Sequence, residues 1–168
     1  MSWFDAHLAA VLRHEGGFVN HKDDPGGMTN LGVTRKVWEA WTKIPANEAD
    51  MRALTIDNVK PLYKARYWDA VRGDELPAGV DYCVFDAAVN SGPTRSAMLL
   101  QKALGVSVDG VIGPKTIQAA KVAPPGGLID ALCAKRMEHL RSLPHFRTFG
   151  AGWTRRVNEV REYALKMI

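Results

Sequence analysis

Two carboxylates and a hydroxyl lie close together in the first fifth of the chain, and their types suit acid catalysis. Glu15 stands directly before two glycines, Asp24 lies in the glycine-rich turn that follows, and Thr29 comes five residues later. The negative end of a helix dipole and burial against Phe18 favour the protonated form of Glu15, whereas backbone donors in an open turn keep Asp24 ionised. One carboxyl that donates a proton and one that stays an anion form the pair that hydrolysis of a glycosidic bond requires. Thr29 adds a hydroxyl that could hold a water molecule.

The elements that must position these groups follow from the apolar pattern. Apolar residues at helical spacing predict a first helix over residues 3–15, ended by the glycines at 16 and 17. Residues 18–34 contain a turn cluster between two short segments, which predicts a small β-hairpin or irregular insertion. Further helices are predicted over residues 34–45, 55–67, 80–90, 93–104, from 114 onward, 128–142 and 153–167. The predicted fold class is therefore mainly α.

Length and composition describe a globular protein with two lobes. A chain of 168 residues, 46% of them hydrophobic, buries a core without needing disulfides or metal, and disorder is excluded. The stretch at residues 73–79 contains two glycines and a proline and predicts a boundary. We expect an N-terminal lobe at residues 1–72 that carries Glu15, and a C-terminal helical lobe at residues 80–168, packed together as one compact unit. Cys83 and Cys133 lie in apolar helical patterns and are expected to be buried, reduced thiols.

Positive charge is concentrated near the C-terminus. The net charge is +4, but residues 135–166 hold eight Lys and Arg against three Glu. A basic face suits an anionic partner such as the bacterial envelope, and an ordinary solvated helix surface explains the pattern equally well. Aromatic residues among these charges are few and no recognition motif is present, so we do not expect a nucleic-acid partner. The first 20 residues carry charges where a signal peptide needs an apolar stretch, which predicts a protein made in the cytoplasm.

Several segments of the chain form recognisable motifs. The first set is Arg13-His14-Glu15-Gly16-Gly17-Phe18, Asp24-Pro25-Gly26-Gly27 and Thr29-Asn30-Leu31-Gly32-Val33-Thr34. The second set is Tyr67-Trp68, Phe85-Asp86 to Asn90-Ser91-Gly92, and Leu100-Gln101 through Asp109-Gly110 to Gly113-Pro114. The first set resembles the opening of glycoside hydrolase family 108, whose members are N-acetylmuramidases found as phage endolysins and in related bacterial proteins. The second set is similar to the peptidoglycan-binding half of that family, and the resemblance covers roughly residues 5–160 of the chain.

The resemblance implies a lysozyme-like fold and an enzyme that cleaves the bond between N-acetylmuramic acid and N-acetylglucosamine in bacterial peptidoglycan. It makes Glu15 the catalytic acid. A more distant likeness to helical phage lysozymes supports Asp24 and Thr29 as its partners and favours inversion at the anomeric carbon. Those lysozymes have five residues between the last two groups, whereas this chain has four, so Asn30 or Thr34 are alternatives to Thr29. An endolysin of this kind would act in the periplasm or cell wall after release from the host cytoplasm by a holin-type pore.

Substrate-binding candidates come from the second half of the resemblance. Trp68 could stack on a sugar ring, because sugars present apolar faces. Asn90 and Ser91 lie just before Gly92, where their side chains could hydrogen-bond an acetamido group, although helix capping explains them as economically. The spacing of His14, His21 and Asp23 matches no metal motif, and we expect neither a metal nor another cofactor.

Two other functions compete with the hydrolase. A lytic transglycosylase would leave an anhydro sugar at the cut instead of a hydrolysed end. A wall-binding module would hold glycan without cutting it, and it would have no need of Glu15. In each case the expected partner is peptidoglycan, bound by a monomer.

Overall fold

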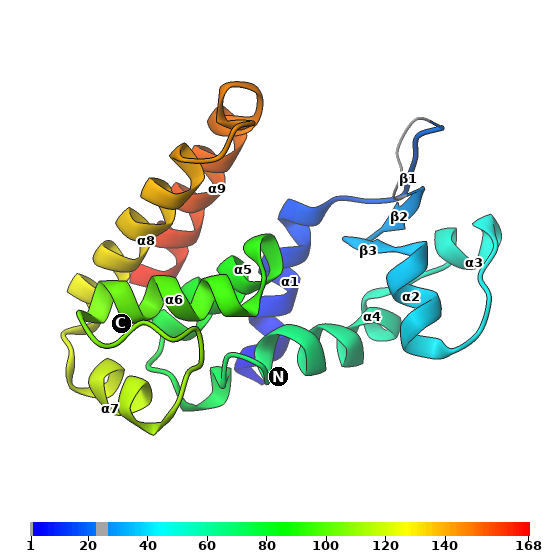
Figure 1. Cartoon of the computed structure of the whole chain (residues 1–168). Helices are drawn as coiled ribbons and strands as arrows, with labels where there is room; N and C mark the ends of the chain where they lie inside the picture. The colour runs from blue at the N-terminus through cyan, green and yellow to red at the C-terminus, as the bar shows by residue number, and fades with distance from the viewer. Residues whose placement is uncertain (1, 23–26) are drawn as a thin grey trace. The chain divides into compact units, whose positions relative to one another are not determined.

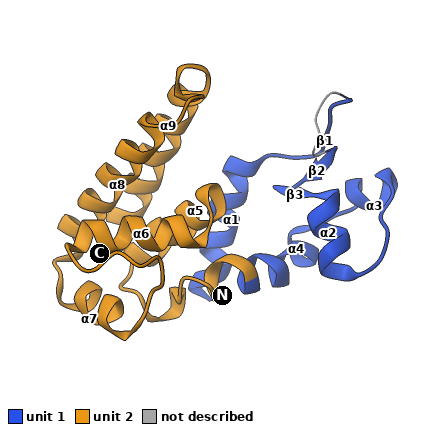
Figure 2. Ribbon diagram, viewed as in Figure 1, with its two compact units in different colours: residues 1–65 blue, residues 66–168 orange. Residues whose placement is uncertain are grey.

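The computed structural model describes residues 2–22 and 27–168, and the chain forms two compact units, residues 1–65 and 66–168 (Figure 2). Asp24 lies outside the described residues. Among the described residues the structure is mainly helical, with one small antiparallel sheet in the first unit (Figure 1). The predicted fold class is confirmed in this respect.

Within its described residues, the first unit combines four helices with the sheet. Its elements are α1 (Trp3–Glu15), β1 (Val19–Asn20), β2 (Met28–Asn30), β3 (Val33–Thr34), α2 (Arg35–Thr42), α3 (Glu48–Arg52) and α4 (Ile56–Tyr63). The strands are ordered β1-β2-β3, with Thr29 opposite Val19 on one side and Thr34 on the other. Thr29 therefore lies on the central strand of the sheet.

Local signals fix both ends of α1. Ser2 and Asp5 form a reciprocal capping box at its start, which satisfies two backbone donors. Gly16 takes a φ of 77° at the other end, a conformation that glycine adopts without a steric penalty. Phe4, Leu8 and Val11 are buried along one side of the helix. The helix therefore ends at Glu15, as the sequence predicts.

The second unit is a helical assembly. After a π-helical turn at Lys64–Trp68 and a 3-10 turn at Gly73–Glu75 come α5 (Val80–Ser91), α6 (Pro93–Leu104), α7 (Pro114–Val122), α8 (Pro125–Arg141) and α9 (Phe146–Leu165). The α8 and α9 helices lie side by side, and α6 packs against both α5 and α8 (Figure 1). The core of this unit includes Phe85, Leu100, Ile129 and Val160, each fully buried.

Some helices differ from the predicted ones in their existence or in where they begin. The short α3 helix was not predicted, and α8 begins at Pro125 rather than near residue 128 because proline is well suited to the first helical position. The α9 helix begins at Phe146 rather than near 153, and it continues through Gly150, where the Phe146 ring occupies the space a side chain would need.

The two compact units meet in the sequence between residues 65 and 66. This position comes before the predicted 73–79 stretch, which lies in the second unit.

The two cysteines behave as the sequence predicts. Cys83 on α5 and Cys133 on α8 are buried and form no disulfide. The hydrogen bond that its thiol donates to the sulfur of Cys133, together with burial, raises the pKa of Cys83 well above its ordinary value. Among the described residues, no helix is both long and apolar enough to cross a bilayer.

Candidate active site

Glu15 occupies the C-terminal end of α1, at the point where the chain leaves the helix. The residue is half-buried, and the Oε1 atom of its carboxyl group is withdrawn from solvent. The Phe18 ring, on the segment that follows, lies beneath the Arg52 guanidinium, whose carbon is 4.0 Å from the ring centroid. The turn between β2 and β3 comes close to the Glu15 side chain.

Gly32 in that turn leaves room for the Glu15 side chain. A Cβ atom placed on Gly32 would lie 3.0 Å from both Cβ and Cγ of Glu15, and 2.5 Å from the hydroxyl of Tyr63. Gly32 also has a φ of 72°, which L side chains rarely adopt. Glycine is therefore required here twice, by the backbone conformation and by the approach of the proton-donor candidate.

Tyr63 holds the same turn in place. Its hydroxyl donates a hydrogen bond of 2.7 Å to the carbonyl of Leu31, which itself has a φ of 50°. Two successive residues with positive φ between paired strands form the type I′ geometry that matches strand twist. The buried Tyr63, at the end of α4, thus holds this strained turn in place. The turn then confines the Glu15 side chain.

Gly32 and Tyr63 were not among the candidates drawn from the sequence. The glycine between two short β segments is a local signal that could have identified the turn. Tyr63 is 32 residues from its hydrogen-bond partner, and no local pattern connects the two.

The three candidates for the water-holding position differ in what their side chains already do. The Asn30 amide donates to the Met51 carbonyl at 2.9 Å and is buried. The Thr34 hydroxyl accepts from the backbone of Val37 and caps α2. The hydroxyl of Thr29 has no such partner within the described part of the chain, and its side chain is half-buried. Among the contacts of the described residues, Thr29 is therefore the one of the three whose side chain is not committed to a backbone partner.

Trp68 lies in the core of the second unit. Its side chain is 1% exposed, its indole Nε1 donates to Asp74 at 3.0 Å, and its ring meets the edge of Phe85. A ring so enclosed offers no face to a sugar, so the stacking expectation is corrected. The sequence could not show this, because a tryptophan suits a core and a binding platform equally well.

Asn90 and Ser91 form the last turn of α5, and Asn90 is exposed. The Asn90 Oδ1 atom accepts a hydrogen bond of 3.2 Å from Arg136 on α8. This hydrogen bond uses one lone pair of Oδ1 and sets which way the amide is turned, and the NH2 group can then donate to a ligand.

Arg136 belongs to a buried charge cluster centred on Asp86. Its Nη1 atom lies 2.7 Å from the Asp86 carboxylate, and Arg156 of α9 contacts the same carboxylate at 3.0 Å. Burial alone would raise the pKa of Asp86, but the two guanidinium groups outweigh it and hold the pKa below its ordinary value. The cluster ties α5, α8 and α9 together beneath Asn90.

Comparisons with known proteins place these features in a family. Residues 8–92 match the family model described as glycosyl hydrolase 108, which spans about half of the chain and includes Glu15 and Gly32. The chain belongs to glycosyl hydrolase family 108. It is accordingly a glycoside hydrolase, a muramidase, and its fold is the mainly α, lysozyme-like one that the sequence predicts.

Two further comparisons cover the rest of this family 108 protein, beyond residue 92. Residues 95–158 match a second model, described as a predicted peptidoglycan domain, so peptidoglycan is a partner of the chain. A solved structure of SagA from Brucella abortus is similar at 43% identity with a TM-score of 0.86, covering 98% of this chain and 94% of that one. A search of curated proteins returned no match.

The basic C-terminal segment of this family 108 hydrolase is partly neutralised by carboxylates elsewhere in the chain. Arg136 and Arg156 pair with Asp86, and Arg161 pairs with Asp130 at 2.7 Å. Counting the charged residues between 135 and 166 could not show these pairs, because both aspartates lie outside that segment. Among the described residues, no group of three or more His, Cys, Asp and Glu could hold a metal ion.

Proposed function

We propose that this protein hydrolyses the glycosidic bond between N-acetylmuramic acid and N-acetylglucosamine in bacterial peptidoglycan, with Glu15 as the general acid. One observation carries the proposal. The Glu15 side chain is held at the end of α1 against the Gly32 backbone, with one carboxyl oxygen withdrawn from water. A positioned carboxyl group of this kind can protonate the leaving glycosidic oxygen.

The other two groups of the motif complete the reaction. Asp24 remains an anion and stabilises positive charge on the sugar, or it positions the attacking water together with Thr29. The available hydroxyl on the central strand supports Thr29 in this role. Attack by a water molecule opposite the leaving group inverts the anomeric carbon, and this route requires carboxyl groups about 6.5 to 9.5 Å apart.

Asn90 and Ser91 bind the substrate through hydrogen bonds. The Arg136 contact orients the Asn90 side chain, and its NH2 group donates to a carbonyl of the substrate, such as that of an acetamido group. The charge cluster below holds the residue in this orientation, which reduces the entropy lost on binding.

The proposed physiological role is lysis of the bacterial wall, as an endolysin that reaches the wall after release from the cytoplasm. Membership of a family of peptidoglycan-cleaving hydrolases supports this role. Purified protein added to cells with a permeabilised outer membrane should lower their turbidity within minutes. If the turbidity of the cells stayed unchanged while the protein still digested isolated wall, the lytic role would be contradicted.

Analysis of the products tests the assigned bond. Peptidoglycan is digested, the new ends are reduced with borohydride, and the fragments are identified by mass spectrometry. Reduced muramic acid is expected. Reduced glucosamine would show a glucosaminidase and an anhydro end a lytic transglycosylase, and the absence of new ends would leave only wall binding. Each of these three results would overturn the proposal.

A further inference from the structure

A groove lined mostly by basic and polar side chains runs along the contact between α6 and α8. It has a volume of about 280 Å³. Arg95, Leu99 and Lys102 follow one another at helical spacing on α6, and they face a matching stripe on α8. That stripe consists of Lys135, Glu138, His139 and Ser142. Leu99 is buried, whereas the charged side chains around it reach solvent to different degrees.

The charges in this groove are unbalanced. Lys135 pairs with Glu138 at 3.4 Å, but neither Arg95 nor Lys102 forms an ion pair with a carboxylate of the described chain. Burial, with help from Arg95 and Lys102, holds the pKa of His139 below its ordinary value. The groove therefore presents two uncompensated cations beside a histidine that favours its neutral form, an arrangement suited to an anionic ligand.

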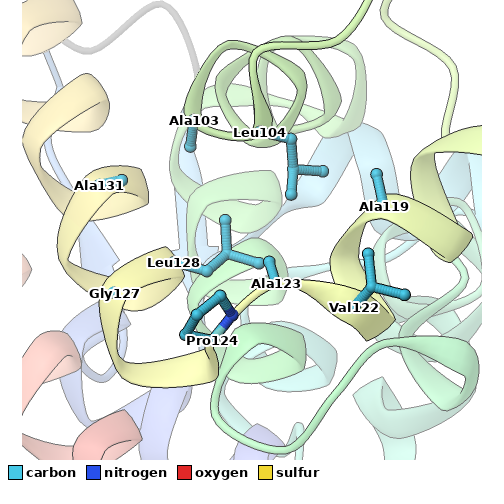
Figure 3. A pocket seen from close by; sticks show the side chains of 9 residues that line it. All are labelled: Ala103, Leu104, Ala119, Val122, Ala123, Pro124, Gly127, Leu128 and Ala131. Carbon is cyan, nitrogen blue, oxygen red and sulfur yellow. The ribbon is translucent and has the colours of Figure 1, made fainter.

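An apolar hollow adjoins the basic groove on the same two helices. Figure 3 shows the side chains that line this hollow. The volume of the hollow is about 410 Å³. On α6 the lining continues one turn from Leu99 in the groove to Ala103 in the hollow. On α8 it continues one turn back from Lys135 to Ala131 and a further turn to Leu128. Val122 on α7 lines the same hollow. A ligand lying along the two helices would therefore meet positive charge first and small apolar side chains next.

We propose that this α6–α8 seam binds the stem peptide of peptidoglycan, with the peptide carboxylates in the basic groove and the methyl groups of its terminal alanines in the apolar hollow. The inference rests on the proposed function, because it assumes peptidoglycan as the substrate. Every residue that lines the two hollows lies within the matched peptidoglycan domain at residues 95–158. Where a stem peptide is attached, the lactyl carboxyl group of N-acetylmuramic acid is consumed in the amide bond to that peptide. The carboxylates that a basic groove would select there are those of the peptide.

Binding of a defined peptide to the full-length protein tests the inference. The probe is N-acetyl-L-alanyl-γ-D-glutamyl-meso-diaminopimelate. Its binding is measured by calorimetry and by the change in the NMR signals of His139. We expect binding that weakens as salt rises, together with a higher His139 pKa in the complex, because a bound carboxylate stabilises the imidazolium. The same peptide with its carboxylates amidated should bind far more weakly.

Two double variants separate the groove from general surface charge. Arg95→Gln with Lys102→Gln should weaken binding roughly tenfold, since each exposed ion pair contributes a modest amount. The control, Lys115→Gln with Arg155→Gln, removes two exposed cations outside the groove and should leave the affinity within about twofold. Equal affinity of both double variants, or absence of binding to the wild type, would overturn the proposal.

Two further binding experiments test the identity of the ligand. The pentapeptide that ends in D-alanyl-D-alanine should bind about fourfold more tightly for each methyl group buried, and Val122→Ser should reduce this gain. Inorganic phosphate that bound the same residues as tightly would indicate a phosphate polymer or lipid headgroup and would overturn the peptide assignment. Failure of peptide binding while the wild type still cleaves peptide-free glycan strands would reject this inference and leave the proposed function intact.

Discussion

The backbone of Gly32 lies directly against the side chain of Glu15. A single added carbon at Gly32 would come within 3.0 Å of the two Glu15 methylene-chain carbons Cβ and Cγ. The turn between β2 and β3 is therefore a wall of the site rather than a simple connection. The position of the proton donor depends on a glycine that takes no part in proton transfer.

Replacing Gly32 by alanine should lower the rate of peptidoglycan cleavage by about 10- to 100-fold, because misplacement of a catalytic group by about 1 Å costs this much. The positive φ adds a steric penalty of about 1 to 2 kcal/mol to folding. Rates of dye release from labelled wall and unfolding curves in urea measure the two effects. Gly152→Ala is the control, because that position has open space around it. Equal rates for Gly32→Ala and the wild type would show that the contact does not position Glu15.

Tyr63→Phe should destabilise the first unit by about 1 kcal/mol, since it removes the hydrogen bond to the Leu31 carbonyl and keeps the ring. The variant should also have a lower kcat even where it is fully folded, because the freed turn no longer confines Glu15. Comparing kcat at a temperature where both proteins are fully folded isolates this effect. A variant that lost stability and kept the wild-type kcat would limit Tyr63 to a structural role.

Asn90→Asp separates substrate binding from packing. The aspartate keeps an oxygen acceptor for Arg136 but loses the amide donors, so stability should be maintained while KM rises several-fold. Thermal unfolding and steady-state kinetics on soluble glycan fragments provide the two readouts. If Asn90 only caps the helix, KM will stay at the wild-type value.

Acid should remove the stabilisation contributed by Asp86. The two guanidinium groups hold its pKa in the folded protein below the ordinary value of 3.8, so the unfolded chain takes up the proton first as the pH falls. The contribution of the charged Asp86 is therefore complete above the unfolded pKa and is lost as the pH falls through the folded pKa.

The Asp86→Asn variant measures this contribution. Breaking a buried ion pair costs about 3 to 5 kcal/mol, so the variant should be less stable than the wild type by about that amount at pH 7. The difference should narrow below about pH 4, as urea unfolding at a series of pH values would show. Arg161→Gln breaks only an exposed pair and should cost about 1 kcal/mol or less. A difference between wild type and Asp86→Asn that did not vary with pH would contradict the role of the charged carboxylate.

Local chemistry made much of the fold predictable. The end of α1 is set by Gly16, the start of α2 by the Thr34 cap, and both ends of α6 by Pro93 and Gly105, so each boundary is encoded within a few residues. The small sheet followed from its turn residues. The motif around Glu15 was visible for the same reason, since its parts are close in sequence.

The remaining features depend on contacts between distant residues. Asp86 meets Arg136 and Arg156, which are 50 and 70 residues away, so the charge count could not show that these arginines are neutralised. The burial of Trp68 likewise depends on how the second unit packs. The contact of Gly32 with Glu15 requires the sheet to fold back on α1, which no periodic pattern records.

The rate of peptidoglycan cleavage by Glu15→Gln tests the central claim most directly. Glutamine keeps the shape of the side chain and cannot donate the proton, so a correctly folded variant should lose at least about a hundredfold in kcat. Glu162→Gln, an exposed change on α9, serves as the control and should retain wild-type activity. Cleavage by Glu15→Gln at the wild-type rate, with its fold verified by circular dichroism and its melting temperature unchanged, would contradict the account.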